Sequence, residues 1–118
     1  MENLAPKVFR QRLLIDFIYT TEMHEKLIIR FLKELTKELG LKIYSPPVVH
    51  VSTGRGKKIN SGFDAFAPLV ASGIYFGTWS QESFVSMVMY TCKGFNAKKA
   101  VEFTRKFFKA SKLAYKQF

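Results

Sequence analysis

The stretch SFVSMVMYTC, residues 83–92, decides the fold class, because apolar and polar side chains alternate along it. Alternation with a period of two is typical of a β-strand that packs one face on a hydrophobic core. Residues 63–76, just upstream, also have a strand-like pattern, and Gly77 is expected to end that strand. We therefore expect two neighbouring strands here, paired in an antiparallel manner.

A helix is predicted downstream of these strands, over residues 96–118, with Asn96 as its N-cap. Apolar and small residues recur along it at helical spacing and form one inward stripe. The stripe consists of Ala100, Val101, Thr104, Phe107, Phe108, Ser111 and Ala114. The opposite face of this helix is basic.

A second amphipathic helix is predicted upstream of the strands. Thr20 or Thr21 can cap its start, and Gly40 supplies a stop at its end. Its apolar face consists of Leu27, Ile28, Phe31, Leu32, Leu35 and Leu39. The helical spacing of these residues indicates a face that packs on the sheet.

Further strands are predicted over residues 8–19, 41–44 and 48–52, and the loop TGRGKKINSG, residues 53–62, is expected to be mobile. Together the elements predict an α+β fold, a two-layer sandwich of an antiparallel-rich sheet with two helices on one face. With 118 residues, the chain is expected to form a single domain, with a basic loop at 53–62 and a basic C-terminal helix at 96–118.

The composition is that of a protein with one packed core. Twelve Phe and five Tyr supply large apolar side chains, and the sole cysteine, Cys92, excludes an internal disulfide. No apolar run has the length of a membrane span, and no signal peptide is recognised, so a cytoplasmic location is expected. His24 and His50 with one cysteine fall short of a zinc site, so no metal is expected.

The charge is strongly positive, since 19 Lys and Arg face nine Asp and Glu, for a net charge of +10. Such a balance indicates polyanionic partners, of which nucleic acid is the first candidate. The predicted phosphate-binding residues are Arg10, Arg12, Arg55, Lys57, Lys58, Lys98, Lys99, Arg105, Lys106, Lys109, Lys112 and Lys116. An anionic membrane surface, or a charge that merely solvates the chain, are the alternatives.

The segment ASGIYFGTWSQ, residues 71–81, resembles the active-site signature of the prokaryotic S-adenosylmethionine decarboxylases, ESHxxxHTWPE. Thr78 and Trp79 fall in register with it. Cys92, in the context YTCKG, stands twenty residues after Ser72, at the interval of the family's catalytic cysteine. The stretch RLLIDF, residues 12–17, resembles the family's first strand, and the segment that starts at Asn96 resembles its last helix.

The resemblance implies enzymes that cleave themselves before a serine and convert that serine to a pyruvoyl group, an electron sink for loss of carbon dioxide. Ser72 matches the precursor serine and Cys92 the proton-donating cysteine. Other positions of the signature differ: its glutamate is Ala71, its two histidines are Gly73 and Gly77, and its final pair is Ser80 and Gln81. Glycine cannot transfer protons, so these differences predict a chain that forms no pyruvoyl group and has no cofactor.

The sequence therefore predicts a non-catalytic RNA-binding protein on a decarboxylase scaffold, ribosomal or ribosome-associated, with rRNA and ribosomal proteins as partners. In this interpretation Ser72 is an ordinary strand serine and Cys92 a small buried hydrophobic residue. One alternative is a catalytically inactive partner of an active decarboxylase, in a homodimer or heterodimer. Another is a pyruvoyl-dependent decarboxylase of polyamine synthesis with the pyruvoyl group at Ser72, and a third is a DNA-compacting protein.

Overall fold

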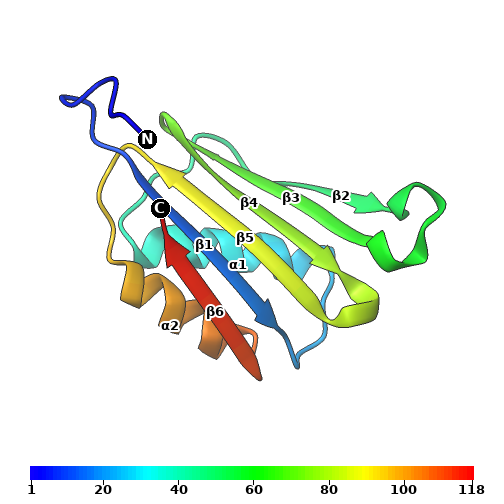
Figure 1. The fold of residues 1–118 in the computed structure, drawn as a ribbon. Helices are drawn as coiled ribbons and strands as arrows, with labels where there is room; N and C mark the ends of the chain where they lie inside the picture. The colour runs from blue at the N-terminus through cyan, green and yellow to red at the C-terminus, as the bar shows by residue number, and fades with distance from the viewer.

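The computed structural model describes residues 1–118, which form one six-stranded antiparallel sheet with two α-helices on one of its faces (Figure 1). The strands are β1 Gln11–Ile18, β2 Val48–Ser52, β3 Gly62–Leu69, β4 Ser72–Trp79, β5 Phe84–Thr91 and β6 Lys112–Gln117. The helices are α1 Glu25–Glu38 and α2 Ala97–Phe107. The strand order is β2-β3-β4-β5-β1-β6, and the α+β prediction is confirmed.

The core fills the space between the sheet and the two helices. Phe31 of α1 is fully buried, with its ring centroid 4.7 Å from that of Phe108 and 5.6 Å from that of Phe76. Each of these rings contributes a large apolar area, which explains how so short a chain makes a core without disulfides. Neither helix is long and apolar enough to span a membrane.

The face of the sheet that points away from the helices is called the open face below. Ile74 and Phe76 of β4 are fully buried on the helix side. Because successive side chains of a strand point to opposite faces, Gly73, Tyr75 and Gly77 lie on the open face. No helix covers this face, so it is where side chains are free to meet a ligand or another chain.

The strand predicted over residues 63–76 is in fact two strands, β3 and β4, joined by a tight turn at Val70 and Ala71. This turn contains neither glycine nor proline, so no local pattern predicts it. Ala71 supplies the necessary backbone geometry itself, with φ at 51°. Gly77, expected to end a strand, lies inside β4 and pairs with Asp64 and Ser86.

The prediction of a helix over residues 96–118 is wrong for the second half of this range. Asn96 caps it as predicted, by accepting a hydrogen bond from the Lys99 N–H, but α2 ends at Phe107. Lys109 takes a left-handed conformation, with φ at 46°, which stops the helix without a glycine. The chain then forms β6, which pairs with β1 through Ile18 and Lys112, so Ser111 and Ala114 do not belong to a helical stripe.

The remaining predictions differ in detail. His24, rather than Thr20 or Thr21, caps α1, and Gly40 lies just past its end with φ at 70°. Residues 41–44 form only an isolated bridge, whereas residues 48–52 form β2 as predicted. The loop 53–62 contains two short 3-10 turns, Gly54–Gly56 and Lys58–Asn60, and its mobility stays a prediction.

Candidate functional site

Ser72 and Cys92 meet at one end of the sheet, where β4 begins and β5 ends. The Ser72 Oγ accepts a hydrogen bond from the Cys92 backbone N–H over 3.0 Å. The same hydroxyl lies 3.6 Å from the Cys92 Sγ, and this thiol lies 3.5 Å from the Val70 carbonyl oxygen. The two residues that stand twenty apart in the sequence are therefore in direct contact, as a shared site requires.

Antiparallel register brings this pair together. Gly73 lies opposite Tyr90 in the β4–β5 ladder, which places the residues just before Gly73 beside those just after Tyr90. Cys92 is an exposed free thiol, so the prediction that it is a buried hydrophobic residue is wrong. It lies just after β5, in contact with Ser72.

The peptide bond before Ser72 belongs to a strained turn. Ala71 has φ at 51°, in the left-handed region where a side chain costs about 1–2 kcal/mol. A cleavage at this bond would release that strain. Strain of this kind is often found at functional sites, because the surrounding structure must hold it in place.

Two hollows adjoin Ser72. The first has a volume of about 400 Å³ and lies on the open face, lined by Phe66, Ala71, Ser72, Gly73, Tyr75, Val88 and Tyr90. The second, of about 250 Å³, contains both Ser72 and Cys92 and is lined by Leu41, Lys42, Leu69, Val70, Ser72, Cys92 and Lys93. The first hollow is mainly apolar and includes three aromatic side chains, as expected for a pocket that takes the apolar body of a small molecule.

Aromatic side chains occupy the space beside both glycines of β4. The Phe66 ring from β3 lies over Gly73, and the hydroxyl end of Tyr75 lies over Gly77. Each of these glycines is therefore covered by a ring. A side chain at either position would collide with the ring above it.

Tyr75 also makes the one polar contact at this place. Its hydroxyl donates a hydrogen bond to the Asp64 Oδ1 over 3.0 Å. Burial, followed by the hydrogen bond and the charge of Asp64, raises the pKa of Tyr75 to about 12. Sequence reasoning missed this pair, although the alternation along β4 puts residue 75 on the same face as the two signature positions 73 and 77.

The two histidines lie apart from Ser72 in the fold. His24 accepts the Leu27 N–H at the start of α1, and His50 is exposed on β2, opposite Asp64. Histidine, cysteine and carboxylate side chains nowhere gather in a group of three or more that could hold a metal ion. His50 is the nearer of the two to the open-face residues described above.

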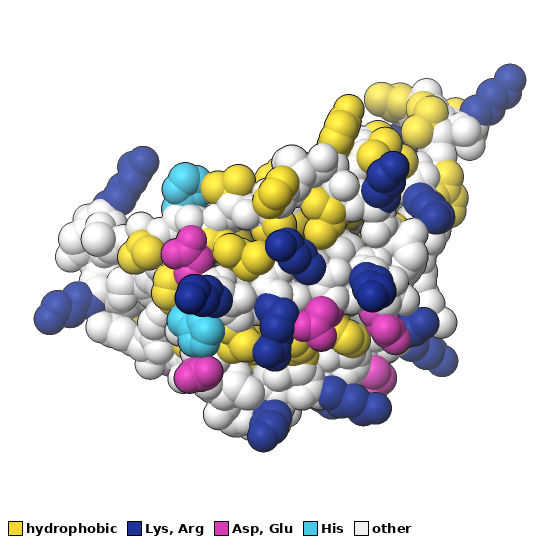
Figure 2. All heavy atoms as spheres, turned by 180° about the vertical axis from the view of Figure 1, so that it is seen from behind, with side chains coloured by type: hydrophobic (Ala, Val, Ile, Leu, Met, Phe, Trp, Pro, Cys, Tyr) yellow, Lys and Arg dark blue, Asp and Glu magenta, His cyan; other side chains and the backbone are white.

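The basic residues are distributed over several parts of the molecule. Lys98, Lys99, Arg105 and Lys106 lie on α2, Lys109 follows it, and Lys112 and Lys116 lie on β6. On the helix side, Lys and Arg side chains (dark blue) lie among Asp and Glu side chains (magenta) (Figure 2). Lys99 pairs with Glu38 and Arg105 with Glu102. The predicted phosphate-binding residues of this segment therefore lie on α2, on β6 and between these two elements, rather than on one helix.

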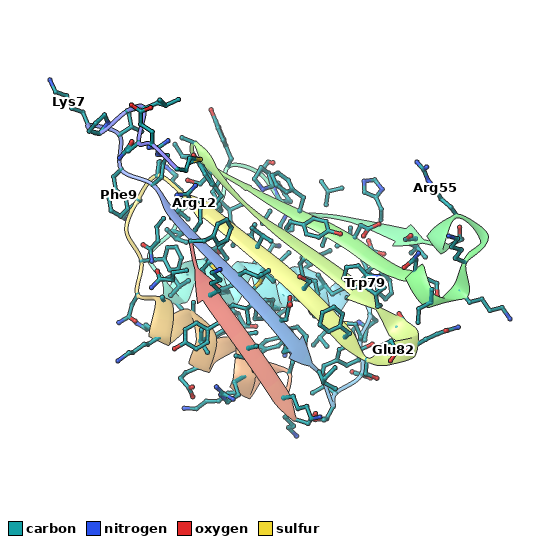
Figure 3. The ribbon with its side chains drawn as sticks, viewed as in Figure 1. Lys7, Phe9, Arg12, Arg55, Trp79 and Glu82 are labelled. Carbon is teal, nitrogen blue, oxygen red and sulfur yellow. The ribbon has the colours of Figure 1, made fainter.

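The second basic group is divided as well. Arg10 and Arg12 lie at or just before the start of β1, while Arg55, Lys57 and Lys58 lie in the loop after β2, so that Arg12 and Arg55 stand at opposite ends of the sheet (Figure 3). The Arg12 guanidinium stacks on the Phe118 ring at 5.5 Å. These residues belong to two places rather than to one surface.

Comparison with known proteins identifies the scaffold. The family model described as S-adenosylmethionine decarboxylase matches residues 11–118. Among solved structures, the adenosylmethionine decarboxylase from Aquifex aeolicus VF5 is similar in fold, with a TM-score of 0.71 and 16% sequence identity over 95% of this chain and 90% of that one. No curated protein matches the chain.

These findings overturn the functional prediction. The family match is to a family of enzymes, so the predictions of a non-catalytic protein, of RNA binding and of a ribosomal role are wrong. The prediction that the chain has no cofactor is wrong for the same reason, since this family uses a pyruvoyl group. The positive charge misled the interpretation, because net charge reports on possible partners and not on the fold or the site.

Proposed function

Because the chain belongs to the S-adenosylmethionine decarboxylase family, we propose that it is a self-processing, pyruvoyl-dependent decarboxylase, with S-adenosylmethionine as its first candidate substrate. The observation that carries this proposal is the contact between Ser72 and Cys92 beside the strained residue Ala71. Self-cleavage needs the serine hydroxyl beside a strained peptide bond, and the neighbouring thiol can transfer a proton in the later decarboxylation. They lie beside two hollows that are open to a small molecule.

Self-processing would begin at the bond between Ala71 and Ser72. The Ser72 oxygen attacks the Ala71 carbonyl carbon, the peptide C–N bond breaks, and the nitrogen takes the hydroxyl proton, which leaves an ester. Loss of the Ser72 Cα proton then expels Ala71 as a carboxylate. Water converts the remaining unsaturated residue into a pyruvoyl group and releases ammonia.

The Cys92 backbone supports the first of these steps. Its N–H donates to the Ser72 Oγ over 3.0 Å, so it holds the hydroxyl in a fixed orientation. The donor is a main-chain group, and it is held in place by the β4–β5 ladder. A nucleophile that is already oriented lowers the barrier, because less orientational freedom is lost in the reaction.

The glycines at positions 73 and 77 make this reaction slow. A positioned acid or base typically contributes about a hundredfold to ten-thousandfold to a rate, and neither glycine can provide one. We therefore expect self-cleavage that takes place over hours in the purified protein, driven by strain and by the oriented hydroxyl.

The residues around Ser72 fit a pyruvoyl group at the first position of β4. Once formed, such a group supplies an electron-withdrawing carbonyl that promotes loss of carbon dioxide from a bound amino acid. The apolar lining of the larger hollow would contact the apolar part of the substrate, and the Cys92 thiol stands within reach to hold or deliver a proton.

A second copy of this chain is the partner that we propose for the open face. Phe66 and Tyr90 are 47% and 42% exposed there, so their rings are available to an apolar partner surface. Asp16 and Asp64 share this face with Lys112 and Lys116, so that the face carries both charges and can pair with itself in a two-fold dimer. Sedimentation should give a dimer that Tyr90→Lys converts to a monomer, and a monomeric wild-type chain would contradict it.

The decarboxylation itself is tested by release of carbon dioxide from S-adenosylmethionine labelled at its carboxyl carbon. The cleaved protein should release it and the Ser72→Ala variant should not, since the variant lacks the hydroxyl that begins processing. Equal release from both would reject the proposed site. We further propose a cytoplasmic location, with which the free thiol of Cys92 agrees.

A further inference from the structure

A third hollow lies on the open face, next to the one at Ser72. It has a volume of about 360 Å³ and is lined by Val48, His50, Asp64, Ala65, Phe66 and Tyr75. Phe66 and Tyr75 line both this hollow and the one at Ser72, so their rings are the wall that the two share. A molecule held at residue 72 can extend across these rings into the third hollow.

The third hollow differs from the one at Ser72 in its charged and titratable groups. Both are mostly apolar and share the Tyr75 phenol, but the third hollow also contains the carboxylate of Asp64 and the imidazole of His50. These three groups come from neighbouring strands, since His50 of β2 lies opposite Asp64 of β3, and Asp64 lies opposite Gly77 of β4. Pockets for small molecules are typically apolar with a few polar groups that fix the orientation of the ligand.

Tyr75 and Asp64 are held in place for such a role. The hydroxyl of Tyr75 rests over Gly77 and donates to the Asp64 Oδ1, so neither side chain is free to turn away. Burial and the neighbouring charge raise the pKa of Tyr75 to about 12, and the phenol therefore stays neutral at physiological pH. Asp64 makes no ion pair within the chain, which leaves the charge of its carboxylate available to hydrogen-bond donors.

We propose that Asp64, Tyr75 and His50 form a substrate subsite, which binds the hydrogen-bond donors at the end of the substrate that is remote from the carboxylate to be lost. This inference rests on the proposed decarboxylase function, because it takes residue 72 as the reacting end. Asp64 accepts hydrogen bonds from hydroxyl or ammonium donors, and Tyr75 fixes the orientation of the Asp64 carboxylate. His50 lines the subsite on the β2 side. Ligands without donors at the remote end bind weakly.

The test measures binding without chemistry, in a Ser72→Ala background that cannot be cleaved. Calorimetry with S-adenosylmethionine should give a Kd that rises by about tenfold or more with Asp64→Asn, since a charged acceptor is lost. Tyr75→Phe should raise it by a smaller factor, because the ring and its cover over Gly77 remain. Glu82→Gln is the matched control, because it removes a carboxylate outside all of these hollows (Figure 3), and it should leave the Kd unchanged.

The outcomes separate the subsite from the proposed function. If Asp64→Asn weakens binding and the wild-type chain never cleaves, the subsite stands and the proposed function fails. If the wild type cleaves and releases carbon dioxide but Asp64→Asn and Tyr75→Phe leave the Kd and the KM unchanged, the subsite is overturned. Absence of any binding to the Ser72→Ala protein would also overturn it.

Discussion

The side chain of Tyr75 lies over Gly77, which follows it by two residues in the same strand. A Cβ at Gly77 would stand 2.5 Å from the Tyr75 hydroxyl oxygen. The ring carbons would be only 3.0 Å away. The Tyr75 phenol therefore occupies its place only because position 77 has no side chain. A glycine at this place of β4 is a packing requirement of Tyr75.

Gly77→Ala should for this reason destabilise the chain by about 1–3 kcal/mol, as overpacking does. In a Tyr75→Ala background the same substitution should cost much less, because the obstructing ring is gone. Urea unfolding of the four proteins of this double-mutant cycle measures the difference. Equal costs in the two backgrounds would show that the ring does not occupy this space.

The ionisation of Tyr75 should also affect stability at high pH. Its pKa is raised from 10.0 to about 12 in the folded chain, by burial first and by Asp64 second, so the folded chain holds this proton more tightly than the unfolded chain. The contribution to stability is complete below pH 10 and is lost as the pH rises towards 12. The free energy of unfolding of the wild type should thus fall relative to that of Tyr75→Phe over this range, and parallel curves would contradict the shift.

Ala71→Gly should relieve the strain at the bond that we expect to be cleaved. Glycine takes a positive φ without cost, whereas alanine at 51° costs about 1–2 kcal/mol. The variant should therefore cleave itself severalfold more slowly, as followed by gel electrophoresis over time. Its melting temperature serves as a control, and faster cleavage would show that strain does not drive the reaction.

Cys92→Ala should separate self-cleavage from decarboxylation. The substitution keeps the backbone N–H that holds the Ser72 hydroxyl, so the two fragments should still form. It removes the thiol, and with it a proton-transfer group typically worth about a hundredfold or more, so release of carbon dioxide should fall by that factor. A variant that does not cleave would assign the thiol a role in processing.

Part of this fold follows from local sequence signals. The cap at Asn96, the stop at Gly40 and the alternation of residues 83–92 each report on a few neighbouring residues, and each was interpreted correctly. The turn at Ala71 and the helix end at Lys109 have left-handed backbones without glycine. Strand pairing imposes these conformations, so no local pattern indicates them.

The candidate site divides in the same way. The spacing of Ser72 and Cys92 matched a family pattern, and the structure brings the two into contact. Asp64 and Tyr75 meet only because β3 and β4 pair in one register. A pattern that predicts a single strand over residues 63–76 does not reveal this pairing. The sequence shows only that Gly73 and Gly77 stand where the family signature has histidines. The rings that lie over them explain why these positions have no side chain.

The central claim is that Ser72 cleaves the chain, and the intact mass of the purified protein tests it most directly. After incubation at neutral pH, the wild type should give two fragments, residues 1–71 with a free carboxylate and residues 72–118 with a pyruvoyl group at the start. The Ser72→Ala variant should keep the mass of the full chain under the same conditions. A wild-type chain that keeps its full mass as long as the variant does would contradict the account.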